Sequence, residues 1–477
     1  MLTKRKFFCA AALTAITDTA ARSGSVLLIL ARRRWGVPPI VLAVLLAFSA
    51  ISTPAHAQTE TGAAKGQETG KVGIISRLRE NWNHLLRRSK DPIVLSPAQK
   101  AAVGNVTSSP EAVNVSVLKM PDPALVQEMM TRDLPQDERY AKVVLPLSGD
   151  KYVTLLRKRP TVKSDQGFTW RGEVEQTGEP AVLMLWRDGH LTGNFAYNGN
   201  IFMVNNLGSD IHTLSEFDPN KLPPDHTPGT KNTTAGHAPA VPKVAPFPDA
   251  ERRALEAKTI VIDVMILYTK DAAAKHIGDP ADLLALAIEQ ANETYRNSGL
   301  GNITLRLVHT QQIDFDEAGI DQFNIVYQMA DGAGPFKDVK RLRNEKRADI
   351  VGLIIDNPNG CGLSTRVGAD ADEAFFVVHH SCAAMTISIA HEVGHIIGAR
   401  HDRVVDANNT PFAYGHGYVN GNKWRTMMSY KEGCGGCPRI PYWSNPRVMY
   451  KGEATGTAAN DNARVILEQA ERVSRFR

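Results

Sequence analysis

The sequence predicts an α/β module in the C-terminal half of the chain and an antiparallel β-rich domain before it. From about residue 258 onward, strand-like apolar runs alternate with segments that have helical spacing. Residues 113–217 instead contain short alternating runs that are separated by turn residues. A proline-rich stretch separates the two parts, and 477 residues are enough for more than one folded unit.

The N-terminus has the features of a secretion signal. Basic residues precede an apolar run over 40–50, and Ala55, His56 and Ala57 provide a small-x-small cleavage signal before Gln58. The apolar run is too short to span a bilayer comfortably, which favours a removable signal peptide over a stable membrane anchor. We therefore expect a secreted, extracellular protein.

The leader also accounts for the basic balance of the chain. The whole sequence has a formal net charge of +5, but residues 1–57 contain seven Lys or Arg and one Asp, so the remainder carries −1. A folded part without excess positive charge gives no reason to expect nucleic acid or anionic membranes as partners.

The next two segments differ in pattern. Residues 58–112 are polar and rich in Gly and Ala, except for helical spacing over 74–88, and are expected to form a tether, with a loosely attached helix as the alternative. The β-rich domain over 113–217 follows, with turn signals between its runs. Its expected strands are 140–147, 151–156, 167–174, 181–186 and 191–204.

A linker over residues 218–257 follows the β-rich domain. Its proline-rich part, from Asp218 to Asp249, contains eight prolines. Such a stretch cannot bury enough apolar area to offset the entropy cost of ordering it. We therefore expect this stretch to be extended and accessible, with a processing site.

Residues 258–477 form the expected catalytic module. The expected strands are 259–268, 302–309, 349–356 and 375–379, the last as an edge strand. The expected helices are 281–298, 323–330, 337–347 and 385–397. The sequence after residue 401 is mostly irregular.

The most informative motif lies on the last expected helix. His391 and His395 are four residues apart, so their imidazoles share one face and can bind one metal ion, for which zinc is expected. Glu392 between them is the expected base that takes a proton from metal-activated water. Gly398 can end the helix in a left-handed conformation and turn His401 back as a third ligand. Three histidines leave one position open for water.

This spacing resembles the pattern His-Glu-x-x-His-x-x-Gly-x-x-His of the metzincin zinc endopeptidases. Asp402 directly after the third histidine is similar to the reprolysin (adamalysin) branch, where this residue is a structural hydrogen-bonding residue and not a ligand. Further segments are similar to bacterial peptidyl-Asp metalloendopeptidases: 380–383, 437–446, 456–458 and 461–464. The resemblance covers about the last 220 residues.

The segment over 426–430 resembles the methionine-containing turn beneath the metal of metzincins. The resemblance implies that Met428 lies under the zinc, with Met427 as the alternative register. It also implies that Tyr430 is a catalytic phenol, which donates a hydrogen bond to the developing oxyanion or serves as a removable extra ligand.

The resemblance implies a metzincin catalytic domain. Its expected form is a twisted mixed sheet with two helices above, a zinc helix along the active-site cleft and a small irregular C-terminal lobe. The β-rich domain then resembles a propeptide, which would inhibit the enzyme until it is removed. The alternative is a permanent accessory domain.

Some metzincins block their zinc with a propeptide cysteine, but residues 58–360 contain none. Latency would therefore need another ligand or steric cover. Asp210, His212, Asp225 and His226 are candidates by chemistry alone, and the ordinary surface position is the favoured interpretation of each.

The remaining cysteines favour two disulfides. Cys9 leaves with the leader, and an even number of cysteines in an oxidising compartment favours pairing. The favoured pairs are Cys361 with Cys382 and Cys434 with Cys437. A redox or metal role for the second pair is the alternative, although no further cysteine pair completes a structural zinc site.

The resemblance to peptidyl-Asp enzymes implies cleavage before acidic residues and a basic side chain in the pocket beyond the zinc. Arg366, Lys431 and Arg439 are eligible, although each also fits a solvated surface charge. An extended protein or peptide substrate is expected to pair with the edge strand over 375–378.

One catalytic zinc ion is the expected cofactor. Calcium is chemically possible but unsupported, because the acidic loop residues lack ligand-loop spacing. These residues are Asp370, Asp372 and Glu373. Three further histidines, His379, His380 and His416, are expected to support the site by hydrogen bonds or to be exposed.

Three functional classes follow. The first is a secreted zinc endopeptidase that hydrolyses peptide bonds by metal-activated water. The second is a zinc hydrolase of another amide substrate. The third is a catalytically silent secreted binding protein, which the intact Glu392 disfavours.

Overall fold

The computed structural model describes residues 83–131, 142–164, 166–225 and 243–477. The expected signal peptide and part of the expected tether lie outside these residues. Within the described ranges, no helix combines the length and the apolar character that a membrane span requires.

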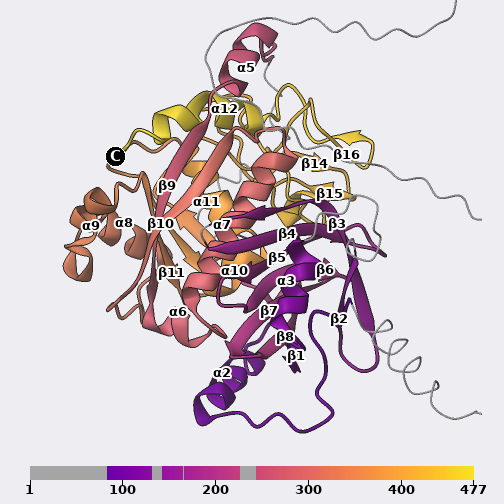
Figure 1. The fold of residues 1–477 in the computed structure, drawn as a ribbon. Helices are drawn as coiled ribbons and strands as arrows, with labels where there is room; N and C mark the ends of the chain where they lie inside the picture. The colour runs from indigo at the N-terminus through magenta and orange to yellow at the C-terminus, as the bar shows by residue number, and fades with distance from the viewer. Residues whose placement is uncertain (1–82, 132–141, 165, 226–242) are drawn as a thin grey trace, which may run out of the picture. The chain divides into compact units, whose positions relative to one another are not determined.

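The N-terminal part folds into one sheet of eight strands in the order β1-β8-β7-β6-β5-β4-β3-β2, all antiparallel (Figure 1). Its strands are β1 (Ala112–Lys119), β2 (Lys142–Pro146), β3 (Tyr152–Lys163), β4 (Gly167–Val174), β5 (Pro180–Trp186), β6 (Leu191–Tyr197), β7 (Asn200–Gly208) and β8 (Ile211–Phe217). Asn198 and Gly199 take positive φ angles of 53° and 83° and divide the run expected over 191–204 into a hairpin. The expected antiparallel β domain is confirmed, and we call this part the N-terminal β domain.

The prediction of a tether is wrong for residues 83–112. Leu85 and Leu86 are fully buried in the core of the N-terminal β domain. Helix α2 (Pro97–Thr107) begins with a capping box, in which Ser96 accepts from the Gln99 amide and the Gln99 side chain accepts from the Ser96 amide. This cap, together with a proline in the first turn, starts a helix that the Gly and Ala composition conceals. Helix α3 (Pro123–Thr131) packs on the same sheet.

The C-terminal part contains a five-stranded mixed sheet in the order β10-β9-β11-β13-β12. Its strands are β9 (Ile260–Thr269), β10 (Ile303–Ile313), β11 (Ile350–Ile355), β12 (Gly362–Ser364) and β13 (Phe375–His379). Four strands are parallel, and β12 runs antiparallel to β13. The expected mixed sheet is confirmed, but the expected edge strand is wrong, since β13 lies between β11 and β12. Three residues of β12 are too few to form a recognisable apolar run.

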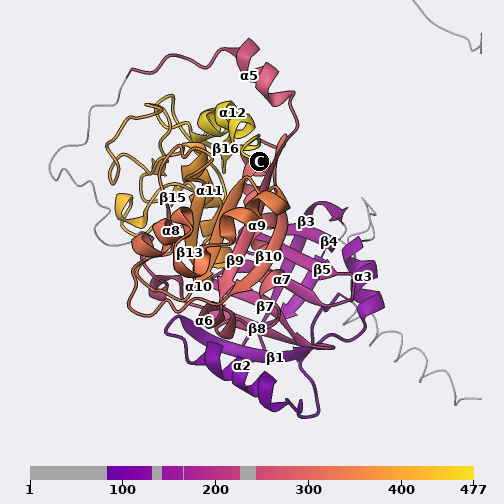
Figure 2. The same ribbon diagram turned by 90° about the vertical axis from the view of Figure 1, so that its left-hand side faces the viewer.

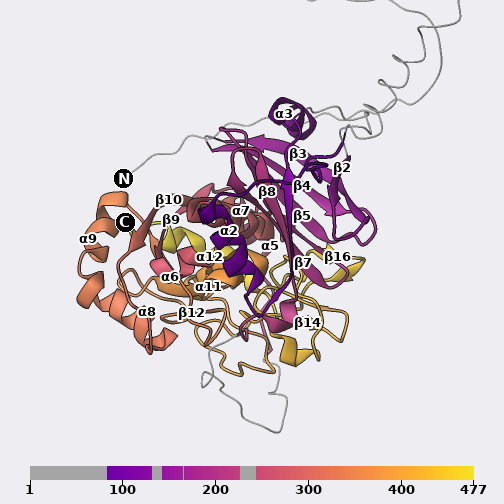
Figure 3. The same cartoon turned by 90° about the horizontal axis from the view of Figure 1, so that it is seen from below.

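Helices cover both faces of this sheet. The helices are α5 (Asp249–Glu256), α6 (Lys270–Ala274), α7 (Pro280–Asn297), α8 (Gln322–Asp331), α9 (Val339–Lys346), α10 (His380–Met385), α11 (Ser388–Ile397) and α12 (Asn462–Val473). Helices α7, α10, α11 and α12 share one apolar cluster with the sheet, whereas α8 and α9 share another with its other face. Figures 2 and 3 show α8 and α9 on the side of the sheet away from α7.

Helix α7 also carries the contact with the N-terminal β domain. Val182, Met184 and Met203 from β5 and β7 belong to the same apolar cluster as Leu283 and Leu284 of α7. The two parts therefore share buried apolar surface.

The linker differs from expectation at both of its described ends. Residues 219–221 form a short 3-10 helix, and Pro224 accepts a hydrogen bond from the backbone amide of Cys361 at 2.8 Å. The Asp225 side chain is only 9% exposed. Residues 249–256 form α5, and residues 226–242 lie outside the described part of the chain. The linker is thus not accessible at Asp225.

Candidate metal centre

Helix α11 is shorter than expected and tightly enclosed. Ile387, with a φ of 58°, separates it from α10, so the helix expected over 385–397 is broken into two. Gly398 ends α11 with a φ of 133°, and a Cβ there would lie 2.9 Å from the Phe412 ring. A Cβ at Gly394 would lie 2.6 Å from the Trp443 ring. Glycine is therefore required at both positions, at one by close packing and at the other also by backbone conformation.

Three imidazoles from α11 and the following turn converge. His391 Nε2 and His395 Nε2 lie 3.1 Å and 2.8 Å from His401 Nε2. His391 Nδ1 lies 3.0 Å from the Met427 carbonyl oxygen, and His395 Nδ1 lies 2.9 Å from that of Ala399. A carbonyl only accepts hydrogen bonds, so each Nδ1 carries the proton, and the two Nε2 lone pairs point at the common centre.

This donor set fits a metal ion. Burial keeps the imidazoles neutral, because it lowers the pKa of His391 well below its ordinary value and that of His395 to about 4. Converging lone pairs without a proton between them repel unless a cation takes them up. Nitrogens at about 2.0–2.1 Å from a tetrahedral ion are about 3.3 Å apart, which is close to the observed separations.

Glu392 lies beside this centre, against the edge strand. Its side chain is buried, and burial raises its pKa to about 8, although hydrogen bonds to Ser364 act in the opposite direction. A Cβ at Gly362 would lie 2.6 Å from Glu392 Oε1, so β12 approaches this carboxylate as closely as a glycine allows. Glu392 Oε2 is buried and has no hydrogen-bond partner among the described residues. This oxygen is available for a molecule in the site.

The turn over 426–430 supports the three histidines. Met427 contributes the backbone carbonyl that orients His391. Met428 is fully buried, and its sulfur would lie 3.2 Å from a Cβ on Gly394 of α11. The Met428 side chain therefore packs beneath α11, and Met427 acts through its backbone.

Tyr430 brings a phenol to the same centre. Its hydroxyl lies 2.7 Å from His401 Nε2, and burial raises its pKa well above the ordinary value. Asp402 accepts hydrogen bonds from the backbone amides of Tyr430 at 2.9 Å and Val404 at 3.1 Å. The Asp402 carboxylate thus joins the loop of the third histidine to the turn and faces backbone donors.

Two disulfides border the site, in the pairing that the sequence favours. Cys361 and Cys382 join the residue before β12 to α10, with sulfurs 2.06 Å apart. Cys434 and Cys437 close a short loop after Tyr430, with sulfurs 2.01 Å apart. The first disulfide connects the edge strand to the segment that leads into α11.

Three basic residues are candidates for the pocket that binds an acidic substrate side chain. Only one of them, Arg439, places its side chain near Asp225. Arg439 Nη2 lies 3.2 Å from Asp225 Oδ1. Lys431 contributes only its backbone amide, at 3.3 Å from Asp225 Oδ2, and Arg366 forms an exposed ion pair with Glu373.

The sequence analysis missed Arg425, whose Nη2 lies 3.3 Å from Asp225 Oδ2. Nothing in its local pattern distinguishes it from a surface arginine. Burial would raise the pKa of Asp225, but Arg439 and Arg425 outweigh burial and lower that pKa to about 2.

Among the three latency candidates that the structure describes, Asp225 is the one found at the site. Asp210 forms an ion pair with Lys119, and the ring of His212 accepts from the Leu191 amide inside the N-terminal β domain. His226 lies outside the described residues.

The other candidate groups have local roles. His416 Nδ1 donates to the His401 carbonyl at 2.8 Å, and His380 contacts Asp356 at 2.9 Å. The Asp370 side chain accepts from the next backbone amides and caps its own loop. Within the described residues, the acidic loop does not form a group suited to a metal ion, whereas Asp356, His379 and His380 form a second group besides the three histidines.

A buried carboxylate beside converging imidazoles is the arrangement of a metal-dependent hydrolase. The sequence profile described as Metallo-peptidase family M12, a reprolysin profile, matches residues 258–444. The peptidyl-Asp metalloendopeptidase of Stenotrophomonas maltophilia strain R551-3 is 30% identical over 399 residues, which cover 79% of this chain and 89% of the relative. That of Xanthomonas campestris pv. campestris is 33% identical over 292 residues, which cover 60% of this chain and 67% of the relative.

Similarity to solved structures is weaker. Metalloproteinase-II from Bacteroides fragilis aligns with a TM-score of 0.35 at 12% identity, over 63% of this chain and 86% of that protein. The relatives and the profile, in contrast, all indicate a metallopeptidase. The chain belongs to the family of the peptidyl-Asp metalloendopeptidases, and it is a metalloendopeptidase whose residues 258–444 match the profile of metallo-peptidase family M12.

Proposed function

We propose that the protein is a zinc endopeptidase in which His391, His395 and His401 hold one zinc ion and Glu392 is the general base. The convergence of the Nε2 atoms, with two Nδ1 protons held by backbone carbonyls, carries this proposal. When bound, zinc supplies a positive charge that lowers the pKa of water and polarises a peptide carbonyl.

The protein groups then handle the protons. Glu392 takes a proton from water through its unpartnered Oε2 and passes it to the leaving nitrogen. Burial raises the pKa of Tyr430, which favours its hydroxyl as a hydrogen-bond donor to the developing oxyanion.

We further propose that the protein is secreted, that cleavage precedes acidic residues, and that the N-terminal β domain is a propeptide. The relatives are named peptidyl-Asp metalloendopeptidases, and two buried arginines lie near the proposed zinc site. The proposed boundaries are 1–57 for the signal peptide, 113–217 for the propeptide, 218–257 for the linker and 258–477 for the protease.

The test uses protein purified from cultures that express the full chain, incubated with casein and with a defined peptide mixture. We expect a chelator to abolish cleavage and added zinc to restore it. Glu392→Gln is expected to lose at least about 10³-fold in kcat/KM, because no other described group is placed to take the proton. The exposed Glu345→Gln on α9 is the matched control and is expected to cut like the parent.

The same experiment separates the alternatives. Mass mapping of the products distinguishes a peptidase from a hydrolase of another amide. If Glu392→Gln cuts as fast as the parent, the assignment of the base is wrong. If the parent binds zinc but cuts no peptide or amide, the protein is a binding protein.

A further inference from the structure

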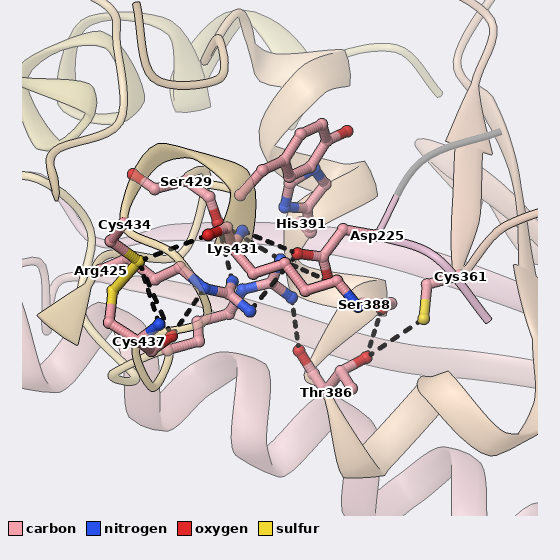
Figure 4. Close-up of polar contacts among 12 residues, drawn as sticks. Asp225, Cys361, Thr386, Ser388, His391, Arg425, Ser429, Lys431, Cys434 and Cys437 are labelled. Carbon is pink, nitrogen blue, oxygen red and sulfur yellow. Dashed lines mark hydrogen bonds and ion pairs between the residues drawn. A yellow bond between two sulfur atoms is a disulfide. The ribbon is translucent and has the colours of Figure 1, made fainter. Parts of the chain in front are cut away.

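Asp225 of the linker is held between two buried arginines of the C-terminal part (Figure 4). Its Oδ2 lies 3.3 Å from Arg425 Nη2, and its Oδ1 lies 3.2 Å from Arg439 Nη2. The Lys431 backbone amide donates to Oδ2 at 3.3 Å. Each carboxylate oxygen therefore contacts a different guanidinium group. The two arginines together are thus suited to bind one acidic side chain.

The C-terminal part itself fixes both guanidinium groups in place. Arg425 donates to the carbonyls of Cys437 at 3.1 Å and Ser429 at 2.8 Å. Arg439 donates to the carbonyl of Thr386 at 3.2 Å. Both arginine side chains are 10% exposed. The linker therefore supplies the negative charge that the two arginines face, whereas the C-terminal part fixes their positions.

Within the described parts of the chain, Asp225 is the sole carboxylate that forms an ion pair with either arginine. Two buried like charges without a counter-ion are costly. When the linker leaves, the pair will therefore favour another carboxylate. A short acidic side chain on an extended peptide meets this requirement.

The linker backbone contacts the chain immediately before the edge strand β12. The Pro224 carbonyl accepts from the Cys361 amide at 2.8 Å, and the Pro223 carbonyl oxygen lies 3.4 Å from Cys361 Sγ. Cys361 immediately precedes the edge strand β12, which packs against Glu392. Backbone pairing at a sheet edge, with one side chain in a pocket, is a common mode of peptide recognition.

We propose that Arg425 and Arg439 form the pocket that selects an acidic side chain of the substrate, and that Asp225 fills this pocket until the linker is removed. The inference rests on the proposed endopeptidase function and deepens it. Asp225 thus acts as an internal competitor of substrate, and the linker covers the cleft without a cysteine.

The test measures binding and needs no turnover. Full-length Glu392→Gln protein is mixed with a fluorescent peptide that contains one Asp, and with its Asn counterpart, and anisotropy is read. Asp225→Ala in this background is expected to bind the Asp peptide at least 10-fold more tightly than the background and more tightly than the Asn peptide. Asp210→Ala, which removes an exposed carboxylate of the N-terminal β domain, is the control and is expected to change nothing.

Equal binding by Asp225→Ala and the background, or equal binding of the two peptides, overturns the proposal. Asp225→Asn keeps the size of the side chain and replaces Asp225→Ala if the latter unfolds, with a smaller gain expected. Adding Arg439→Gln is expected to remove the gain.

The two proposals fail in different ways. If the Asp peptide binds but the parent hydrolyses no peptide even after its linker has been cleaved, the zinc endopeptidase is wrong and the pocket assignment stands. If the parent hydrolyses peptides in a chelator-sensitive way but Asp225→Ala does not tighten binding of the Asp peptide, only the pocket assignment is wrong.

Discussion

Two buried ion-pair sites join the N-terminal half to the C-terminal part, and their polarities are opposite. On α7, Glu293 faces Arg159 at 3.0 Å and Arg171 at 3.2 Å, so the N-terminal β domain supplies the cations. In the cleft, Asp225 faces Arg425 and Arg439, so the linker supplies the anion. The first site joins the N-terminal β domain to helix α7, and the second lies at the proposed substrate pocket.

The two sites also differ in their surroundings. Around α7, Asn194 receives a hydrogen bond from Gln290 at 2.6 Å and donates to the Ala384 carbonyl at 3.2 Å. An apolar cluster shared with α7 adds to this contact. The contacts that hold Asp225 are polar, namely two guanidinium groups and one backbone amide. Holding the domain and covering the pocket are therefore separable properties.

The largest effect that sharpens this comparison is expected from Arg439→Ala. It should lower kcat/KM for peptides with Asp after the cut by about 10²–10³-fold, since a buried charge-assisted contact contributes roughly 3–4 kcal/mol. Peptides with a neutral residue there should change little. Arg366→Ala, which removes an exposed arginine, is the control. An equal loss on both peptides would contradict selection by this arginine.

A smaller effect is expected from Arg171→Ala at the holding site. The change removes a buried guanidinium, whereas Glu289 and Glu293 keep Arg296 as a partner. The loss of charge-assisted hydrogen bonds should lower the free energy of unfolding by about 1.5–3 kcal/mol. Chemical denaturation of the full chain measures it. Lys158→Ala removes an exposed ion pair with Glu173 and should cost less than about 1 kcal/mol. If both variants lower the free energy of unfolding equally, the ion pairs of Arg171 contribute no more to stability than an exposed ion pair.

The smallest effect is a pH dependence through His190. Burial lowers its pKa, but Asp282 of α7, at 2.7 Å, and Asp188 outweigh burial, so the pKa is raised above 6.5. A raised pKa in the folded state gives stability that is complete below pH 6.5 and is lost as pH rises through the raised value. We expect His190→Gln to remove this part of the pH dependence of unfolding. An unchanged profile would exclude the pair as its source.

Some features of the site could be predicted because their cause is local. The spacing of His391, His395 and His401 on one helix and its turn requires only helix geometry, and the structure brings these residues together. The antiparallel β domain follows from alternation and turn residues. Both inferences use neighbours in the sequence.

Other features depend on distant contacts and could not be predicted. Proline content indicates an exposed linker, but Asp225 is buried by Arg425 and Arg439, which lie about 200 residues later. The edge strand β12 is too short to be recognised, and Arg425 has no distinguishing local pattern. The break at Ile387 depends on packing around α11.

Mapping of cut sites in a complex peptide mixture tests the central claim most directly. The mixture is digested by the parent and by Arg439→Ala, and the residue after each cut is identified by mass spectrometry. Cuts by the parent should fall before Asp in most peptides, and this preference should disappear in Arg439→Ala while chelator-sensitive cutting remains. A preference for Asp that survives unchanged in the variant would contradict the account.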